Sequence, residues 1–116
     1  MPLIKMLVTV PVPEARRAAL VKSASEILCG ATGKPEKYAM AMLEQGIAAC
    51  MAGKPAAAAF VDVRSIGSLN KDVNAKISRQ ICDLLQKELK IDPLNVFLNF
   101  TDVPAQNWGW SGATFG

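Results

Sequence analysis

The sequence predicts an α+β fold in which two β-α-β units share one four-stranded mixed sheet, with both helices on the same face. Strand-like and helix-like stretches alternate twice, and the proline that precedes the second strand of each unit recurs at Pro35 and Pro93. This recurrence indicates an internal duplication over about residues 1–55 and 56–116 within a single domain, 1–116. A right-handed crossover should place the two strands of each unit parallel to each other.

The first unit opens with a branched apolar stretch, Leu3–Val10, which favours a strand. From Glu14 onward the apolar residues recur with helical spacing, and we expect an amphipathic helix that ends at Gly30 or Gly33. A second strand is predicted over Tyr38–Leu43. The apolar residues that define the helical period are Leu20, Ala24, Ile27, Leu28 and Ala31.

The second unit follows a loop over 44–55 that holds at most a short strand. Ala56–Val63 is predicted as the third strand, although its four consecutive alanines leave a helical turn as an alternative. A helix should follow with Ser68 or Asn70 as its N-cap, and Val96–Phe100 is the fourth strand. The apolar face of this helix comprises Val73, Ile77, Ile81, Leu84, Leu85 and Leu89.

Composition narrows the classes of function. The net charge of +3 is spread along the chain without a basic block, so we expect no nucleic-acid partner. No apolar run is long enough to cross a membrane, and no signal peptide is recognisable; we therefore expect a cytoplasmic protein, with non-classical secretion left open. Three widely spaced cysteines without histidine match no familiar zinc site, and we expect neither a metal nor an organic cofactor.

The apolar character of the predicted strands bears on assembly. The strands read as apolar on both faces, whereas two helices cover only one face of a four-stranded sheet. We therefore expect the second face to pack against further copies of the chain.

Pro2 is the first candidate for chemistry. A small second residue permits removal of Met1, and the mature chain would then start with a secondary amine on an apolar strand. Because the sequence has no histidine, this amine is a candidate base near neutral pH, and an apolar setting would lower its pKa. The alternative is that Pro2 merely begins an edge strand, where its ring is tolerated.

Other candidates are polar or aromatic residues at turns and strand ends. Lys34 lies in a helix-to-strand turn and could hold a carboxylate, but turn lysines are commonly solvent-exposed. The turn at Ile66 offers backbone N–H groups to an anion, although many such turns bind nothing. Asn99 interrupts an apolar strand and either meets a neighbouring loop or points into a site. Trp108 and Trp110 provide flat apolar surface that is more often structural.

Taken together, these stretches resemble the macrophage migration inhibitory factor family of the tautomerase superfamily along essentially the whole chain. The stretches that carry the resemblance are Met1-Pro2, Thr32-Gly33-Lys34-Pro35, Ser65-Ile66-Gly67, Val96-Phe97-Leu98-Asn99, Asn107-Trp108-Gly109-Trp110 and Thr114-Phe115.

The resemblance implies a trimer with active sites between subunits and a keto–enol tautomerase acting on phenylpyruvate-like α-keto acids. It assigns Pro2 as general base, Lys34 and the Ile66 N–H as binders of the substrate's carboxylate or keto oxygen, and Asn99 as a residue of the adjacent subunit. It also assigns a hydrophobic rim to Trp108, Trp110 and Phe115.

Two departures from the family pattern limit what can be carried over. The family's best-known members have a tyrosine where this chain has Phe97, so a hydroxyl that helps to shape the pocket is absent. They also carry a C-x-x-C where this chain reads 58–61 as Ala-Ala-Phe-Val, so a thiol–disulfide activity does not transfer. Two alternatives stay open: a cytokine-like trimer that binds a protein receptor through a vestigial pocket, and a structural trimer that retains Met1.

Overall fold

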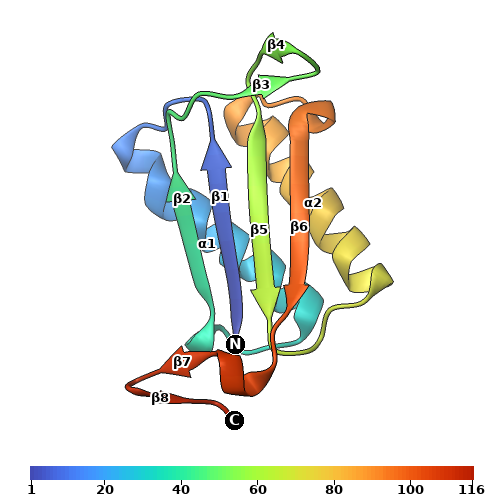
Figure 1. Cartoon of the computed structure of the whole chain (residues 1–116). Helices are drawn as coiled ribbons and strands as arrows, with labels where there is room; N and C mark the ends of the chain where they lie inside the picture. Colours follow the sequence, from blue (N-terminus) through green and yellow to red (C-terminus); the bar gives the residue numbers. More distant parts are fainter.

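The computed structural model describes residues 1–116 as one four-stranded sheet with both helices packed across a single face (Figure 1). The sheet comprises β1 (Pro2–Val8), β2 (Met40–Glu44), β5 (Ala59–Ser65) and β6 (Val96–Asp102), and the helices are α1 (Glu14–Thr32) and α2 (Lys71–Leu89). Short hairpins pair β3 (Cys50–Met51) with β4 (Lys54–Pro55) and β7 (Gly109–Trp110) with β8 (Ala113–Thr114). Neither helix combines the length and the apolarity that a membrane span needs.

The strand order is β2-β1-β5-β6, and its pairing confirms the predicted pair of β-α-β units. β1 runs parallel to β2 and β5 runs parallel to β6, whereas β1 and β5 are antiparallel. Each unit thus contributes one parallel pair, and the two units meet at the centre of the sheet. β1 is consequently an interior strand, and Pro2 does not lie on a sheet edge.

The core lies between the sheet and the helices, and the alternation of side chains along β1 and β5 creates it. Every second residue of these strands is buried beneath the helices, because successive side chains point to opposite faces. The helices contribute residues spaced three or four apart, which lie on one helical face. The fully buried members of this core include Ile4, Met6, Val8, Ala24, Leu28, Val61, Val63, Ile77, Ile81 and Leu85.

Local capping explains where the helices end. Gly33 terminates α1 in the left-handed conformation, with φ of 74°, and its N–H donates to the carbonyl of Cys29. Gly30, the other predicted stop, lies inside the helix. Asn70 caps α2, because its side-chain oxygen accepts a hydrogen bond from the Val73 N–H. The prediction of Gly33 and Asn70 is therefore confirmed.

Several predicted boundaries were wrong by a few residues. The third strand begins at Ala59 and extends to Ser65, because β1 provides partners as far as Pro2. Tyr38 lies in a 3₁₀ turn, Glu36–Tyr38, and the second strand starts only at Met40. The C-terminal stretch, for which no regular structure was predicted, contains a 3₁₀ turn over Ala105–Asn107 as well as the β7–β8 hairpin.

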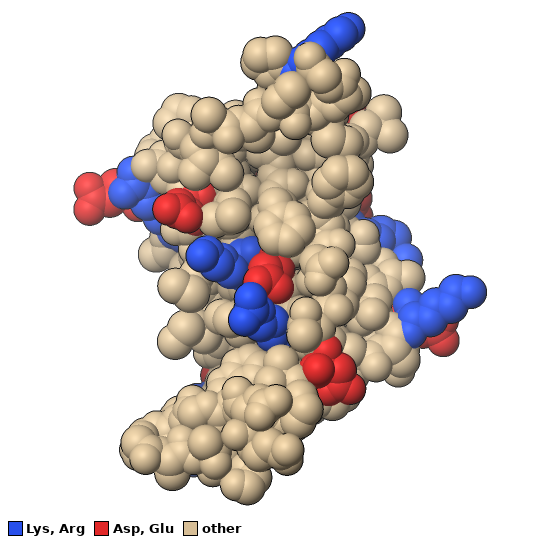
Figure 2. Space-filling model, viewed as in Figure 1, with Lys and Arg blue, Asp and Glu red and all other residues tan.

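The face of the sheet away from the helices, termed here the open face, corrects the prediction of strands apolar on both sides. It does expose large apolar side chains, with Phe97 at 63% and Met40 at 58%. However, alternation also directs Lys5, Asp62 and Arg64 to this face. Figure 2 shows basic and acidic side chains gathered over the middle of the sheet, with tan surface above and below them.

Candidate functional site

A cleft of about 400 Å³ opens at the end of the sheet where the chain begins. Figure 1 shows the N-terminus, the ends of β5 and β6, and the β7–β8 hairpin gathered at this end. The start of β1, β5 and the C-terminal segment all contribute to it, so residues distant in sequence surround the terminus. The residues that line the cleft are Pro2, Leu3, Tyr38, Met40, Arg64, Val103, Asn107, Trp108, Gly109 and Trp110.

Pro2 begins β1 and is fully buried. It pairs with Ser65 of β5, and the Ile66 N–H donates to the Met1 carbonyl at 3.4 Å. In an antiparallel ladder this pattern makes Pro2 and Ser65 a non-hydrogen-bonded pair, so the absence of an N–H on proline leaves no gap in the ladder. Proline at this position therefore costs no hydrogen bond between β1 and β5.

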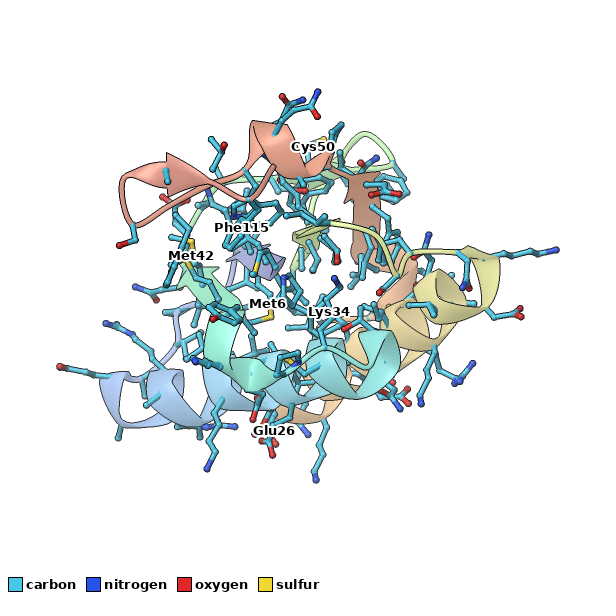
Figure 3. The ribbon with its side chains drawn as sticks, turned by 90° about the horizontal axis from the view of Figure 1, so that it is seen from below. Met6, Glu26, Lys34, Met42, Cys50 and Phe115 are labelled. Atoms are coloured by element: carbon cyan, nitrogen blue, oxygen red, sulfur yellow. The ribbon has the colours of Figure 1, made fainter.

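Lys34 follows the glycine that ends α1 and reaches the chain terminus. Its Nζ donates to the Ile66 carbonyl at 2.6 Å. Burial, and then the positive charge of Lys34, lowers the pKa of the Met1 amine below its ordinary value. Figure 3, which views the molecule along the sheet from this end, shows Lys34 directed inward between helix and sheet. The structure thus brings Lys34 to the terminus, as the sequence predicted.

The turn after β5 was predicted to offer backbone N–H groups to an anion, and both of its N–H groups already meet oxygen atoms of the chain. The Ile66 N–H donates to the Met1 carbonyl, and the Gly67 N–H donates to Oδ1 of Asp102 at 2.9 Å. Gly67 adopts the left-handed conformation, with φ of 72°, which suits glycine. With Met1 in place, both donors are therefore engaged within the chain.

Aromatic side chains cover one side of the cleft. The Trp110 ring meets Tyr38 edge to face at 5.5 Å between centroids and stacks on Phe115 at 5.8 Å. Trp108 lines the cleft, and its carbonyl accepts a hydrogen bond from the Phe115 N–H, which ties the chain end to this wall. The three predicted rim residues are therefore close together, and Tyr38 joins them.

Of the predicted site residues, Pro2, Trp108 and Trp110 line this cleft. Lys34 and Ile66 meet at the chain start and Phe115 stacks on Trp110, whereas Phe97 and Asn99 lie apart from all of these. Both project from the open face of β6, with Phe97 opposite Phe60 and Asn99 opposite Asp62. Phe97 lines a separate apolar cavity of about 190 Å³ near the β3–β4 hairpin. Within one chain, neither side chain lines the cleft that contains Pro2.

Sequence reasoning missed Tyr38, Met40 and Arg64 as cleft residues. Tyr38 lies close after the turn that carries Lys34, which was a usable signal. Arg64 directly precedes the Ser65-Ile66-Gly67 turn, but its side-chain direction depends on the antiparallel register that pairs it with Leu3. That register joins strands far apart in the chain, and no local pattern predicts it.

Ser65 has an unusual environment beside Pro2. Its side chain is completely buried, and its hydroxyl oxygen has no hydrogen-bond partner. Because non-hydrogen-bonded pairs hold their side chains close, this hydroxyl belongs to the immediate surroundings of Pro2. Elsewhere, no group of three or more His, Cys, Asp or Glu side chains is arranged to hold a metal ion.

Comparison with known proteins identifies relatives over most of the chain. The family model described as macrophage migration inhibitory factor (MIF) matches residues 1–116. A macrophage migration inhibitory factor homolog from Brugia malayi is 32% identical over 99 residues, covering 85% of this chain and 86% of that protein. A macrophage migration inhibitory factor from Meriones unguiculatus is 31% identical over 83% of this chain and 84% of its own length.

The fold has a close counterpart among solved structures. The crystal structure of a macrophage migration inhibitory factor homologue from Prochlorococcus marinus superimposes with a TM-score of 0.91 at 34% sequence identity. The match covers 98% of this chain and 99% of the other. The arrangement of strands and helices, including the C-terminal segment that closes the cleft, is therefore shared.

Proposed function

The chain belongs to the macrophage migration inhibitory factor family of the tautomerase superfamily, and from that membership we propose that it is a cofactor-independent keto–enol tautomerase. Its substrates are phenylpyruvate-like α-keto acids, and its general base is the amine of Pro2 after removal of Met1. The observation that carries this proposal is the buried chain start beside Lys34, at the mouth of an aromatic cleft.

The proposed base has a physical rationale. Burial and the Lys34 charge already lower the pKa of the amine on Met1, which is the more exposed residue. Pro2 lies one residue further into the same surroundings, and an amine at that position should likewise be disfavoured as a cation. A neutral secondary amine is then available near neutral pH to accept a proton from carbon.

Loss of Met1 also prepares the place for the substrate oxygen. The Ile66 N–H now donates to the Met1 carbonyl, and removal of that residue frees the donor. The Lys34 ammonium donates to the Ile66 carbonyl and so lies at the same turn as this N–H. The substrate's carboxylate or keto oxygen would occupy this region, where a cation and an N–H stabilise the negative charge that develops in the enolate.

The reaction needs only the substrate's own proton. The Pro2 nitrogen takes the proton from the carbon beside the keto group, the electron pair moves to the keto oxygen, and the protonated amine delivers the proton to that oxygen. The reverse reaction retraces these steps, and no oxidant or other reactant is required. The stacked rings of Trp110 and Phe115, with Trp108 beside them, would receive the aromatic ring of the substrate.

We propose further that the working unit is a homotrimer that completes the site. The open face exposes Met40, Met42, Phe60 and Phe97, each at 40% or more, which is much apolar surface for a chain of this size. Packing of this face against other copies would cover it. In that assembly Asn99 and Phe97 would reach the cleft of the adjacent subunit, which reconciles their predicted role with their distance from Pro2.

The test combines intact mass with a phenylpyruvate tautomerase assay on the same purified sample. The proposal predicts a mass without the initiator methionine together with turnover. A sample that lacks Met1, is correctly folded and shows no turnover would refute the enzyme and leave the signalling alternative. Activity in a sample that quantitatively retains Met1 would refute the proline base.

A further inference from the structure

Arg64 gives the cleft a second cation that the proposed reaction does not use. It belongs to the row of the open face nearest the chain start, where Leu3 pairs with Met40 on one side and with Arg64 on the other. Leu3, Met40 and Arg64 all line the same cleft as Pro2. The Arg64 side chain is 52% exposed in the single chain, and it lies at the end of the open face where the cleft begins.

The hydrogen bonds of Arg64 leave most of its donors free. Its Nε and Nη2 both donate to the same oxygen, Oδ2 of Asp62, at 3.1 and 2.9 Å. A guanidinium carries five N–H donors in a planar fork, and the remaining ones make no hydrogen bond within the chain. Asp62 thus anchors the side chain and leaves one side of the fork available to a carboxylate.

The other charged groups nearby do not compete for this position. Lys5 lies in the next row of the open face, opposite Asp62. The carboxylate of Asp102 is engaged with the Gly67 N–H. Lys34 approaches the chain start from the helix side and donates to the Ile66 carbonyl, whereas Arg64 projects from the opposite face of the sheet. The two cations therefore flank the start of β1 from different sides.

Resting on the proposed function, we propose that Arg64 binds a second carboxylate of the substrate, so that the cleft accepts dicarboxylic α-keto acids as well as aromatic ones. The second carboxylate would lie at Arg64, on the wall of the cleft that Pro2 also lines, while the keto oxygen would be held as in the proposed function. The reaction stays the same: Pro2 moves a proton between carbon and the keto oxygen, and no bond to the second carboxylate changes. Arginine suits this role because its fork matches a carboxylate.

The test measures kcat/KM for the tautomerisation of oxaloacetate and of phenylpyruvate by the same enzyme, corrected for the uncatalysed rates. Arg64→Gln should lower kcat/KM for oxaloacetate by about 10- to 100-fold, the range for loss of a charge-assisted hydrogen bond. Phenylpyruvate turnover should stay within about threefold. Asp62→Asn, which releases the guanidinium from its counter-charge, should preserve or raise oxaloacetate turnover. Arg79→Gln, on the exposed side of α2, is the matched control and should change neither substrate.

The outcomes separate this inference from the function on which it rests. Phenylpyruvate turnover without oxaloacetate turnover, or an equal effect of Arg64→Gln on both substrates, overturns the second carboxylate site and leaves the tautomerase intact. Absence of turnover for both substrates refutes the proposed function, and the role of Arg64 falls with it. A selective loss for oxaloacetate in Arg64→Gln, with Arg79→Gln unchanged, supports the inference.

Discussion

The two faces of the sheet are formed by the same strands, yet they differ in composition and in exposure to solvent. The covered face is almost entirely apolar, and its residues Ile4, Met6, Val61 and Val63 are completely buried beneath the helices. The open face alternates apolar and charged rows and leaves large side chains such as Phe97 exposed. The covered face therefore determines the fold, whereas the open face offers apolar surface to the proposed trimer and contributes Leu3, Met40 and Arg64 to the cleft.

The largest expected effect comes from placing a charge on the open face. Phe97→Asp should abolish the proposed trimer, because the apolar row formed with Phe60 would have to bury a carboxylate. Light scattering should then report a monomer. Phe97→Leu is the control and should keep the trimer. A trimeric Phe97→Asp variant would show that this part of the open face lies outside the interface.

A truncation on the covered face should act on folding itself. Ile81 is completely buried between α2 and the sheet, and Ile81→Ala should lower the free energy of unfolding by about 2–5 kcal/mol through lost burial and a residual cavity. Urea denaturation measures this change. Leu94→Ala, at a side chain 82% exposed, serves as the comparison and should change stability by less than about 0.5 kcal/mol.

Substitution of Lys34 tests the proposed site at the end of the sheet, where the two faces meet. Lys34→Ala should reduce kcat/KM for phenylpyruvate by roughly 10- to 100-fold, because a charge-assisted contact to the substrate is lost. Its charge lowers the pKa of the Met1 amine, and we expect the same effect on the amine of Pro2, so removal of Lys34 should raise that pKa. The rising limb of the pH–rate profile should therefore move to higher pH. An unchanged pH–rate profile would show that Lys34 does not influence the pKa of the base.

Ser65 is the polar exception on the covered face, and its substitution should affect stability less than truncation of the apolar core does. Its hydroxyl is buried without a partner, so Ser65→Ala removes an uncompensated polar group and should change the free energy of unfolding by no more than about 1 kcal/mol. Thermal and urea unfolding would measure this. A loss well above that value would reveal a hydrogen bond of Ser65 within the mature protein.

The covered face was predictable from the sequence because its signals are local. Apolar periodicity identified both helices. The candidates Gly30 or Gly33 for the end of α1, and Ser68 or Asn70 for the start of α2, each included the residue that the structure uses. The boundaries at Tyr38 and Ala59 were missed because they depend on which strand is the neighbour. β5 extends to Ser65 only because β1 pairs with it there.

Part of the candidate site was predictable because its residues belong to local sequence motifs. Lys34 and the tryptophans belong to short motifs, whereas the cleft position of Arg64 follows from an antiparallel register between strands far apart in the sequence. The hydrogen bond from the Ile66 N–H to the Met1 carbonyl is likewise a tertiary contact. Neither feature follows from periodicity or composition.

The free amine of Pro2 is the proposed base, and a single inserted residue removes it. An alanine inserted between Met1 and Pro2 converts the proline nitrogen into an amide, which has no basicity near neutral pH, while the rest of the cleft is retained. The phenylpyruvate tautomerase activity of this variant should be abolished, with the oligomeric state unchanged by light scattering. Full activity in the folded variant would contradict the proline-base mechanism.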